Sequence, residues 1–272
     1  MHFLVLLTLA FTFSCSHKSS YSGKVTIIKQ WHASPGVDTR NIQASKSMPQ
    51  YENQKEIYDY LKNRIKTQKI NFLIVEGCES GIEINENFQQ SFNGWNMLSL
   101  EKASLNKNYD DIVTALPLKL KAKFPKEVTA LCADNESLLK KNQLAISDAR
   151  GFIGFYFRLK EHAADSHKFL TYKKALEGTQ KIEIVDPIGY SKDHTIKSLE
   201  NFNLYIQQRN TLFAEAIKKN INKNPILVVG GLHSTDLINQ LKTEGIEIEV
   251  ITPKGYPDSS EKIVQVLLKQ LE

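Results

Sequence analysis

Short runs of apolar residues alternate along the chain with longer segments in which apolar residues recur every three or four positions. The short runs are rich in Val and Ile and end abruptly at polar residues, at 25–30, 71–75, 128–132, 225–229 and 246–251. Such runs are typical of strands that are buried on both faces of a parallel sheet. The last run alternates apolar residues with Glu, which predicts a strand at the edge of the sheet. Residues 182–185 are a weaker candidate for a sixth strand.

The longer segments have the apolar periodicity of amphipathic helices. They cover residues 52–68, 147–164, 194–220, 235–243 and 259–271, and the second is expected to begin at a Ser147-Asp148 cap. Regular alternation of strands and helices predicts an α/β fold with a mostly parallel sheet covered by helices on both faces. We expect one domain over residues 24–272, with a helical insertion at about 86–126.

The N-terminus has a different composition. Residues 3–13 form an uninterrupted run of apolar residues and Thr, and a helix of this length reaches about 16 Å, too short for a hydrocarbon core of about 30 Å. Residues 1–14 therefore read as a secretory signal, and Ser14 followed by Cys15 resembles the end of a bacterial lipoprotein signal. We expect residues 15–23 to be a tether, with Cys15 attached to lipid at the cell envelope, on the periplasmic or surface side of the outer membrane. Cleavage nearby with Cys15 unmodified is the alternative.

Composition narrows the possible functions. Apolar residues make up 41% of the 272 residues, which excludes a disordered chain. The net charge is +5 without a tight run of Lys and Arg, so we expect no nucleic-acid partner. Beyond Cys15, only Cys78 and Cys132 remain. Two packed thiols are the favoured interpretation of this pair, and a single disulfide is the alternative.

Candidate chemistry follows the predicted strands. His32, Glu76, Asp134 and His233 each come within a few residues of a strand end, where open parallel sheets bind ligands. Two imidazoles and two carboxylates can hold a divalent metal or divide acid and base roles around a carbonyl. The segments around the two histidines are similar to each other, which hints at two pseudo-repeated halves. In the second segment, Gly230-Gly231 permits a sharp turn or the close approach of a ligand.

Four segments carry a family resemblance. They are Gln30-Trp31-His32, Val75-Glu76-Gly77-Cys78, Arg209-Asn210 and Val228–His233. In this order they resemble the G-x-x-H, V-E-x-C, R-N and V-G-x-x-H motifs of the TIKI/TraB/GumN group. That group's wider relatives are the ChaN-like haem-binding proteins and the EreA-like erythromycin esterases. Lys29 departs from the pattern, because it stands where the first motif has Gly.

The resemblance implies an α/β fold of two halves with a cleft at the strand ends. It also implies hydrolysis of an amide or ester in a peptide or small-molecule substrate. His32, Glu76 and His233, with Asp134, would hold Mn²⁺, Co²⁺ or Zn²⁺, or Glu76 would orient an imidazole as the base. Arg209 would clamp an anionic substrate group or oxyanion, or hold its helix to the sheet by an ion pair. Asp134 is alternatively the cap of a helix that begins near residue 136.

Two further functions stay open at this point. One is a haem- or metal-binding lipoprotein of the ChaN type, in which His32 or a Tyr would ligate iron. The other is a family member whose site has decayed, for which Lys29 is the best argument. Cys78 near a histidine is more simply a packed thiol than a nucleophile.

Overall fold

The computed structural model describes residues 22–31, 49–67, 69–92, 95–99, 116–257 and 261–272. The expected signal, tether and lipidation site at Cys15, and also His32, lie outside the described residues. Within the described part, no helix has the length and apolar character needed to cross a membrane.

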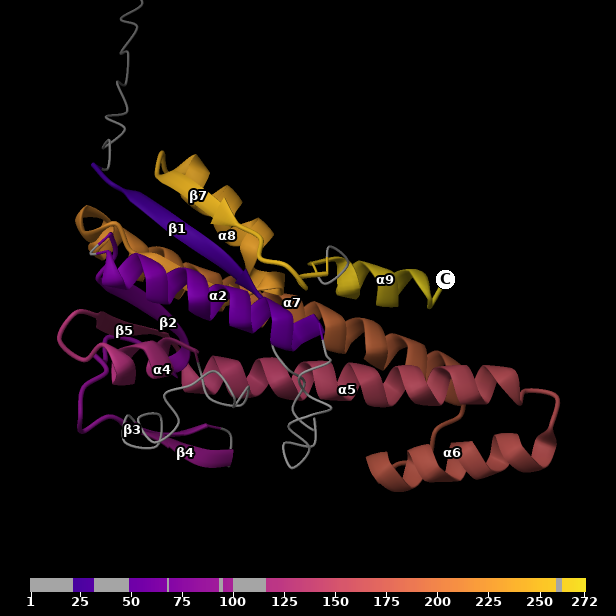
Figure 1. The fold of residues 1–272 in the computed structure, drawn as a ribbon. Helices are drawn as coiled ribbons and strands as arrows, with labels where there is room; N and C mark the ends of the chain where they lie inside the picture. Colours follow the sequence, from indigo (N-terminus) through magenta and orange to yellow (C-terminus); the bar gives the residue numbers. More distant parts are fainter. Residues whose placement is uncertain (1–21, 32–48, 68, 93–94, 100–115, 258–260) are drawn as a thin grey trace, which may run out of the picture.

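A parallel sheet of five strands forms the centre of the molecule (Figure 1). Its strands are β1 (Lys24–Gln30), β2 (Phe72–Glu79), β5 (Thr129–Asp134), β6 (Ile226–Gly230) and β7 (Glu247–Ile251). Their order is β5-β2-β6-β1-β7, and every pairing in the sheet is parallel. The five predicted strands and the α/β class are thus confirmed. The alternating strand does lie at an edge, because its Glu side chains need one solvated face.

Helices cover both faces of this sheet. On one face, α2 (Pro49–Lys66) and α4 (Leu116–Lys123) pack on side chains from alternate strand positions, such as Ile28 and Val75. On the other face, α7 (Pro187–Lys219) and α8 (Gly231–Thr243) bury the intervening positions, such as Ile27. Burial on both faces explains why the strands read as continuous apolar runs.

Two long helices extend beyond the sheet and lie side by side (Figure 1). They are α5 (Glu136–Glu161) and α7, and the shorter α6 (Ser166–Gln180) packs beside α5. The cap expected at Ser147-Asp148 is wrong. The Asn135 side chain accepts a hydrogen bond from the backbone N–H of Leu138, so α5 begins eleven residues earlier.

The same region contradicts the sixth strand. Residues 182–185 are a loop between α6 and α7, in which Val185 is 94% exposed and Ile184 is buried in a small core of the helical extension. Leu159 and Leu176 belong to that core. Ile184 is therefore apolar because it packs against these helices. The segment pairs with no strand among the described residues.

The prediction of a helical insertion at about 86–126 is wrong for residues 89–92 and 95–99. Residues in this range form an antiparallel hairpin of β3 (Gln89–Phe92) and β4 (Trp95–Ser99), and α4 comes later. The Asn93-Gly94 pair, which lies outside the described residues, is the type of sequence that favours a two-residue hairpin turn.

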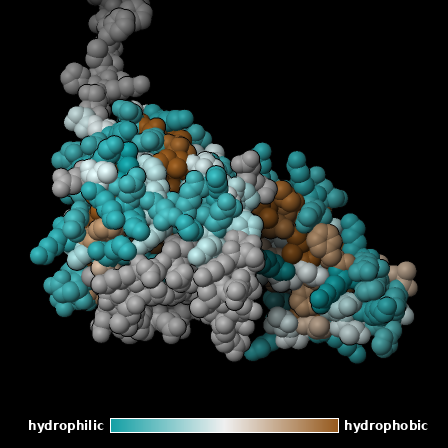
Figure 2. Space-filling view, in the orientation of Figure 1, coloured by the Kyte–Doolittle hydropathy of each residue, from teal (hydrophilic) through white to brown (hydrophobic). Residues whose placement is uncertain are grey.

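The C-terminal segment runs along the α7–α8 face. A 3₁₀ turn (Ile221–Lys223) leads into β6, and α9 (Ile263–Lys269) closes the chain against α5 and α7. Figure 2 shows a mostly hydrophilic face, with brown apolar surface over β7 and α9. The exposed apolar residues of these two elements are Val250, Ile263 and Val266.

Candidate active site

Four of the predicted site residues meet at the carboxyl edge of the sheet. Glu76 lies in β2, Asp134 is the last residue of β5, and His233 lies in the first turn of α8, directly after β6. Arg209 reaches the same place from α7. The strand order puts β5, β2 and β6 next to one another, so residues distant in the sequence become neighbours.

Arg209 bridges the two carboxylates. Its Nε donates to Asp134 Oδ1 at 2.8 Å, and its Nη2 donates to Asp134 Oδ2 and to Glu76 Oε1, both at 2.7 Å. Its side chain is 2% exposed. Burial opposes the charge, but hydrogen bonds with Asp134 and the charge of Glu76 outweigh it and raise the pKa of Arg209. These contacts are those of the ion pair that holds α7 to the sheet.

Gly77 shapes the strand end beside Glu76. Its φ of 88° lies in the left-handed region, and the register of β2 against β5 shifts between Val75 and Glu79. The shift lets Glu76 face Arg209 while Cys78 joins the core on the α2 face. The Gly77 N–H donates to Asp134 Oδ2 at 2.9 Å. The sequence signal for this turn was the glycine inside an apolar strand.

Glu76 is held at both oxygens. Oε1 accepts from Arg209, and Oε2 accepts the backbone N–H of Gly230 at 2.8 Å. Its side chain is 13% exposed, against 1–3% for Asp134, Arg209 and His233. Of the four side chains, that of Glu76 is therefore the one most open to solvent.

His233 is fixed by a residue that strand ends alone do not point to. Asn210, next to Arg209 on α7, donates from Nδ2 to the His233 carbonyl at 3.4 Å, and its Oδ1 lies 2.7 Å from His233 Nδ1. This orientation of the amide assigns the proton to Nδ1 and leaves a lone pair on Nε2. The signal available in the sequence was the adjacent Arg209-Asn210 pair.

The surroundings of His233 favour its uncharged form. Burial, and then the charge of Arg209, lower the pKa of this imidazole, although Glu76 works in the opposite direction. Nε2 lies 3.5 Å from Glu76 Oε1. If Nε2 accepted a proton, the carboxylate of Glu76 would stabilise the resulting positive charge. A neutral imidazole beside a carboxylate is suited to accepting a proton from water.

Asp134 does not cap the following helix. That helix does begin at Glu136 as expected, but Asn135 is the cap, and Asp134 accepts from Gly77, Asn135 and Arg209. Asp134 is fully buried, so its charge is compensated by these donors and not by solvent.

Cys78 and Cys132 form a disulfide, which corrects the favoured interpretation of two packed thiols. Their Cα atoms are 5.2 Å apart, and the bond joins β2 to β5 close to the carboxylate cluster. Both sulfurs are buried among the side chains of the α2 face. A paired sulfur has no thiolate, so Cys78 is not a nucleophile in this state.

Lys29 has a structural explanation. Its Nζ lies 2.5 Å from Glu261 Oε1 and 5.6 Å from the centre of the Tyr256 ring, so it ties the C-terminal segment to β1. Tyr256 also occupies the space beside Gly231, where an added Cβ would lie 1.6 Å from the phenolic oxygen. The room at Gly231 is thus filled by protein, which corrects the expectation that a ligand approaches there. The decayed-site alternative, for which Lys29 was the argument, stays a prediction.

The described residues do not fit a metal centre. No group of three or more His, Cys, Asp or Glu side chains in the described ranges has the arrangement to hold an ion. The guanidinium of Arg209 lies between the carboxylates of Glu76 and Asp134, where an ion shared by them would have to sit. His32 lies outside the described residues, so a metal set that includes it stays a prediction.

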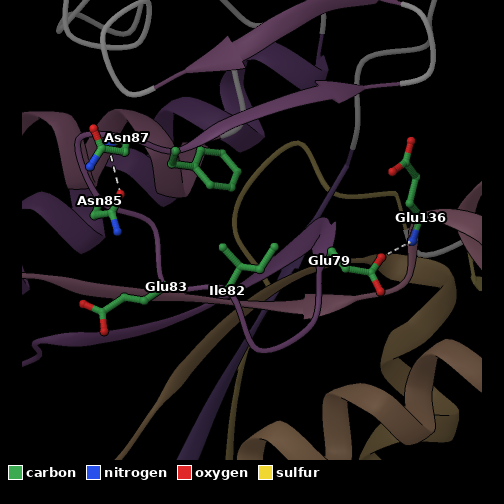
Figure 3. A pocket seen from close by; sticks show the side chains of 7 residues that line it. Glu79, Ile82, Glu83, Asn85, Asn87 and Glu136 are labelled. Carbon is green, nitrogen blue, oxygen red and sulfur yellow. Dashed lines mark hydrogen bonds between the residues drawn. The ribbon is translucent and has the colours of Figure 1, made fainter.

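A hollow lies near the end of β2 and the start of α5, and Glu79 and Glu136 are among the residues that line it (Figure 3). Glu79 points to the start of α5, where its oxygens accept from Glu136 N at 3.0 Å and Asn135 Nδ2 at 3.2 Å. Ile82 and Glu83 line the other side. Glu79 thus secures the helix start that follows Asp134.

The chain matches no known family model, no curated protein and no solved structure. The resemblance to the TIKI/TraB/GumN group accordingly stays an expectation that rests on the four segments.

Proposed function

We propose that this protein is an exported hydrolase of ester or amide bonds in which His233 is the general base. The observation that supports the proposal is the orientation of His233. Its Nδ1–H donates to Asn210 Oδ1, and its Nε2 faces Glu76. An acceptor at Nδ1 and a carboxylate beside Nε2 are the two contacts that orient a histidine base and stabilise its protonated form.

The proposed reaction is the attack of water on a carbonyl carbon. Nε2 of His233 accepts a proton from water as the new C–O bond forms, and the carbonyl becomes an oxyanion. When the intermediate collapses, the bond to the leaving alkoxide or amine breaks, and the imidazolium returns its proton to that group. Glu76 stabilises the imidazolium in the interval.

The other members of the cluster act through Glu76. Arg209 is a positioning residue, because its Nε and Nη2 hold the carboxylates, and Asp134 fixes Arg209 from the far side. His32 follows Trp31 directly, and we propose it as the second imidazole, in contact with substrate. The substrate is a small molecule or a peptide.

Export and anchoring are part of the proposal. The uncharged apolar run of residues 3–13 and Cys15 support secretion followed by lipid attachment. Mass spectrometry of the mature protein from a bacterial host tests this directly. We expect an acylated Cys15 as the first residue, and a chain that begins elsewhere without lipid would contradict it.

Hydrolysis is tested with p-nitrophenyl acetate and the matching p-nitroanilide as probes. We expect His233→Ala to lower kcat/KM by about 100-fold or more, as general-base loss does. His194→Ala is the matched control, because His194 stacks on Tyr190 in the helical extension and should leave the rate unchanged. Wild-type protein with no rate above buffer on any ester or amide probe would overturn the proposal.

Metal dependence is decided in the same assay. We expect the rate to persist after treatment with a chelator and to be unchanged by Mn²⁺, Co²⁺ or Zn²⁺. A rate that appears only with added metal would overturn the metal-free mechanism. It would favour a centre that includes His32.

A further inference from the structure

The opposite edge of the sheet, where the strands begin, collects one kind of charge. In a parallel sheet each helix that leads into a strand ends at this edge. The C-terminal turns of α2, α4, α7 and α8 therefore lie here, together with the starts of the strands. We call the exposed and half-exposed charged residues of these turns, links and strand starts the amino edge.

The amino edge is strongly basic. Its positive residues are Lys24, Arg64, Lys66, Lys69, Lys123, Lys126, Lys218, Lys219, Lys223 and Lys242, and its negative residues are Glu127, Glu244, Glu247 and Glu249. The surplus is six positive charges, whereas the whole chain has a surplus of five from 35 basic and 30 acidic residues. All other residues of the sequence together have a net charge of −1.

A hollow at the centre of the amino edge has an unfilled donor. It is about 320 Å³ in volume, and the charged residues that line it are Lys24, Arg64, Lys69 and Glu247. The Nε of Arg64 is buried and has no hydrogen-bond partner among the described residues. A buried guanidinium nitrogen without an acceptor is costly, and an anion seated in the hollow would satisfy it.

Two carboxylates, Glu247 and Glu249, face the three cations of the hollow and leave one positive charge in excess. Glu249 accepts from Lys24 Nζ at 3.2 Å and from Thr26 Oγ1 at 3.1 Å, so it neutralises one of the three cations. Glu247 also lines the hollow, and Arg64 and Lys69 supply the remaining donors for an anion such as a phosphate group.

The chain enters the domain at this same edge. Lys24 is the first residue of β1, and eight residues separate it from Cys15. A chain of that length spans at most about 30 Å, so a lipid on Cys15 would keep the amino edge within that distance of the membrane. This orientation rests on the lipid anchor proposed above, whereas the charge of the edge does not.

We propose that the amino edge is a docking surface for anionic phospholipid headgroups, with a phosphate seated in the hollow between Arg64 and Lys69. Docking there directs the carboxyl edge, with Glu76 and His233, away from the bilayer. Substrate then reaches the cluster from the aqueous side.

Vesicle binding tests the proposal. The full chain with Cys15→Ser, which removes acylation, is mixed with vesicles of phosphatidylcholine alone or with one third phosphatidylglycerol. The readout is the ratio of the two partition coefficients, so any binding by residues 3–13 that is common to both vesicles cancels. We expect the ratio to favour anionic vesicles and to fall as salt is raised.

The matched variants change the same number of charges in two places. The edge variant replaces Arg64, Lys66, Lys69 and Lys223 by Gln, and the control variant replaces Lys140, Lys141, Lys168 and Lys174, on α5 and α6, by Gln. We expect the edge variant to lower the ratio at least about 10-fold and the control to change it little. Equal effects of the two variants, or no preference for anionic vesicles, would overturn the proposal.

Competition with free phosphate distinguishes a headgroup site from a site for a soluble anion. Millimolar inorganic phosphate should displace the protein from anionic vesicles only weakly, and full displacement would assign the hollow to a free anion. The melting temperatures of both fourfold variants should equal that of the wild type, which shows that they are folded. If the edge variant does not fold, Arg64→Lys replaces it: this change keeps the charge but removes the Nε donor, and we expect it to lower the ratio. The edge variant should retain esterase activity, whereas His233→Ala should retain vesicle binding, so a failure of either proposal is distinguishable.

Discussion

Replacement of Arg209 by Met removes the cation from between two buried carboxylates and keeps most of the side-chain volume. Three hydrogen bonds of 2.7–2.8 Å are lost, and the Asp134 side chain is only 1% exposed. The Asp134 carboxylate cannot then regain its lost solvation without a rearrangement of the strand ends. Breaking a buried pair in this way typically costs about 3–5 kcal/mol, and we expect the free energy of unfolding to fall by that amount.

Denaturation in urea at neutral pH, with the disulfide intact, measures this loss. Lys218→Met is the control, since its partner is Glu244 and both side chains are about 30% exposed, and we expect it to cost only about 0–1 kcal/mol. Asp134→Asn added to Arg209→Met should recover part of the loss, because it removes the most deeply buried charge. A cost for Arg209→Met no larger than that of the control would refute the assignment of Arg209 as the positioning cation.

Three other predictions concern the same strand ends. Gly77→Ala should lower the free energy of unfolding by about 1–2 kcal/mol, because the φ of Gly77 is left-handed, and should slow hydrolysis. Gly178→Ala in α6, where an added methyl meets no atom within 4 Å, should instead raise the free energy of unfolding by up to about 1 kcal/mol. Reduction of Cys78–Cys132 should lower the free energy of unfolding by about 2–4 kcal/mol, and thiol titration before and after dithiothreitol should find two buried thiols only after reduction. The pKa of His233 is lowered in the folded state, so the unfolded state binds the proton more readily; stability should be complete above pH 6.5 and decrease below it, and His233→Gln should flatten this part of a pH series of urea titrations.

The strands were predictable because burial on both faces leaves a strong signal in the sequence. Each apolar run, such as residues 225–229, is a strand with small differences at its ends. The edge position of β7 followed from Glu247 and Glu249, which need solvent. Placing Glu76, Asp134 and His233 at one edge then required only that the strands be parallel.

The helical extension was less predictable. The first half of α5 and all of α6 are mostly polar, since these helices bury narrow apolar stripes against each other and away from the sheet. Periodicity is weak under those conditions, and Asn135 is a cap signal that also suits a loop. The strand predicted at residues 182–185 was wrong because a short apolar run is equally compatible with a loop that covers a small core.

The chemistry of the site depended on contacts that spacing does not reveal. A sequence shows two carboxylates and an imidazole, but not that Arg209 fills the space between them or that Asn210 holds Nδ1 of His233. The ion pair in β1 is similar, because Lys29 looks like a broken motif until Glu261, 232 residues away in sequence, is beside it. Long-range pairing of single side chains has no periodic signature.

The disulfide beside the cluster links the proposed activity to the redox state of the compartment that holds the protein. Cys78 and Cys132 lie two residues from Glu76 and Asp134 in sequence and join the two strands that carry them. In a reducing cytoplasm that covalent link is absent, and the alignment of the two carboxylates depends on noncovalent contacts alone. With the export proposed above, oxidation after secretion would complete the cluster, so the proposed chemistry at His233 would be delayed until the chain has left the compartment in which it was made.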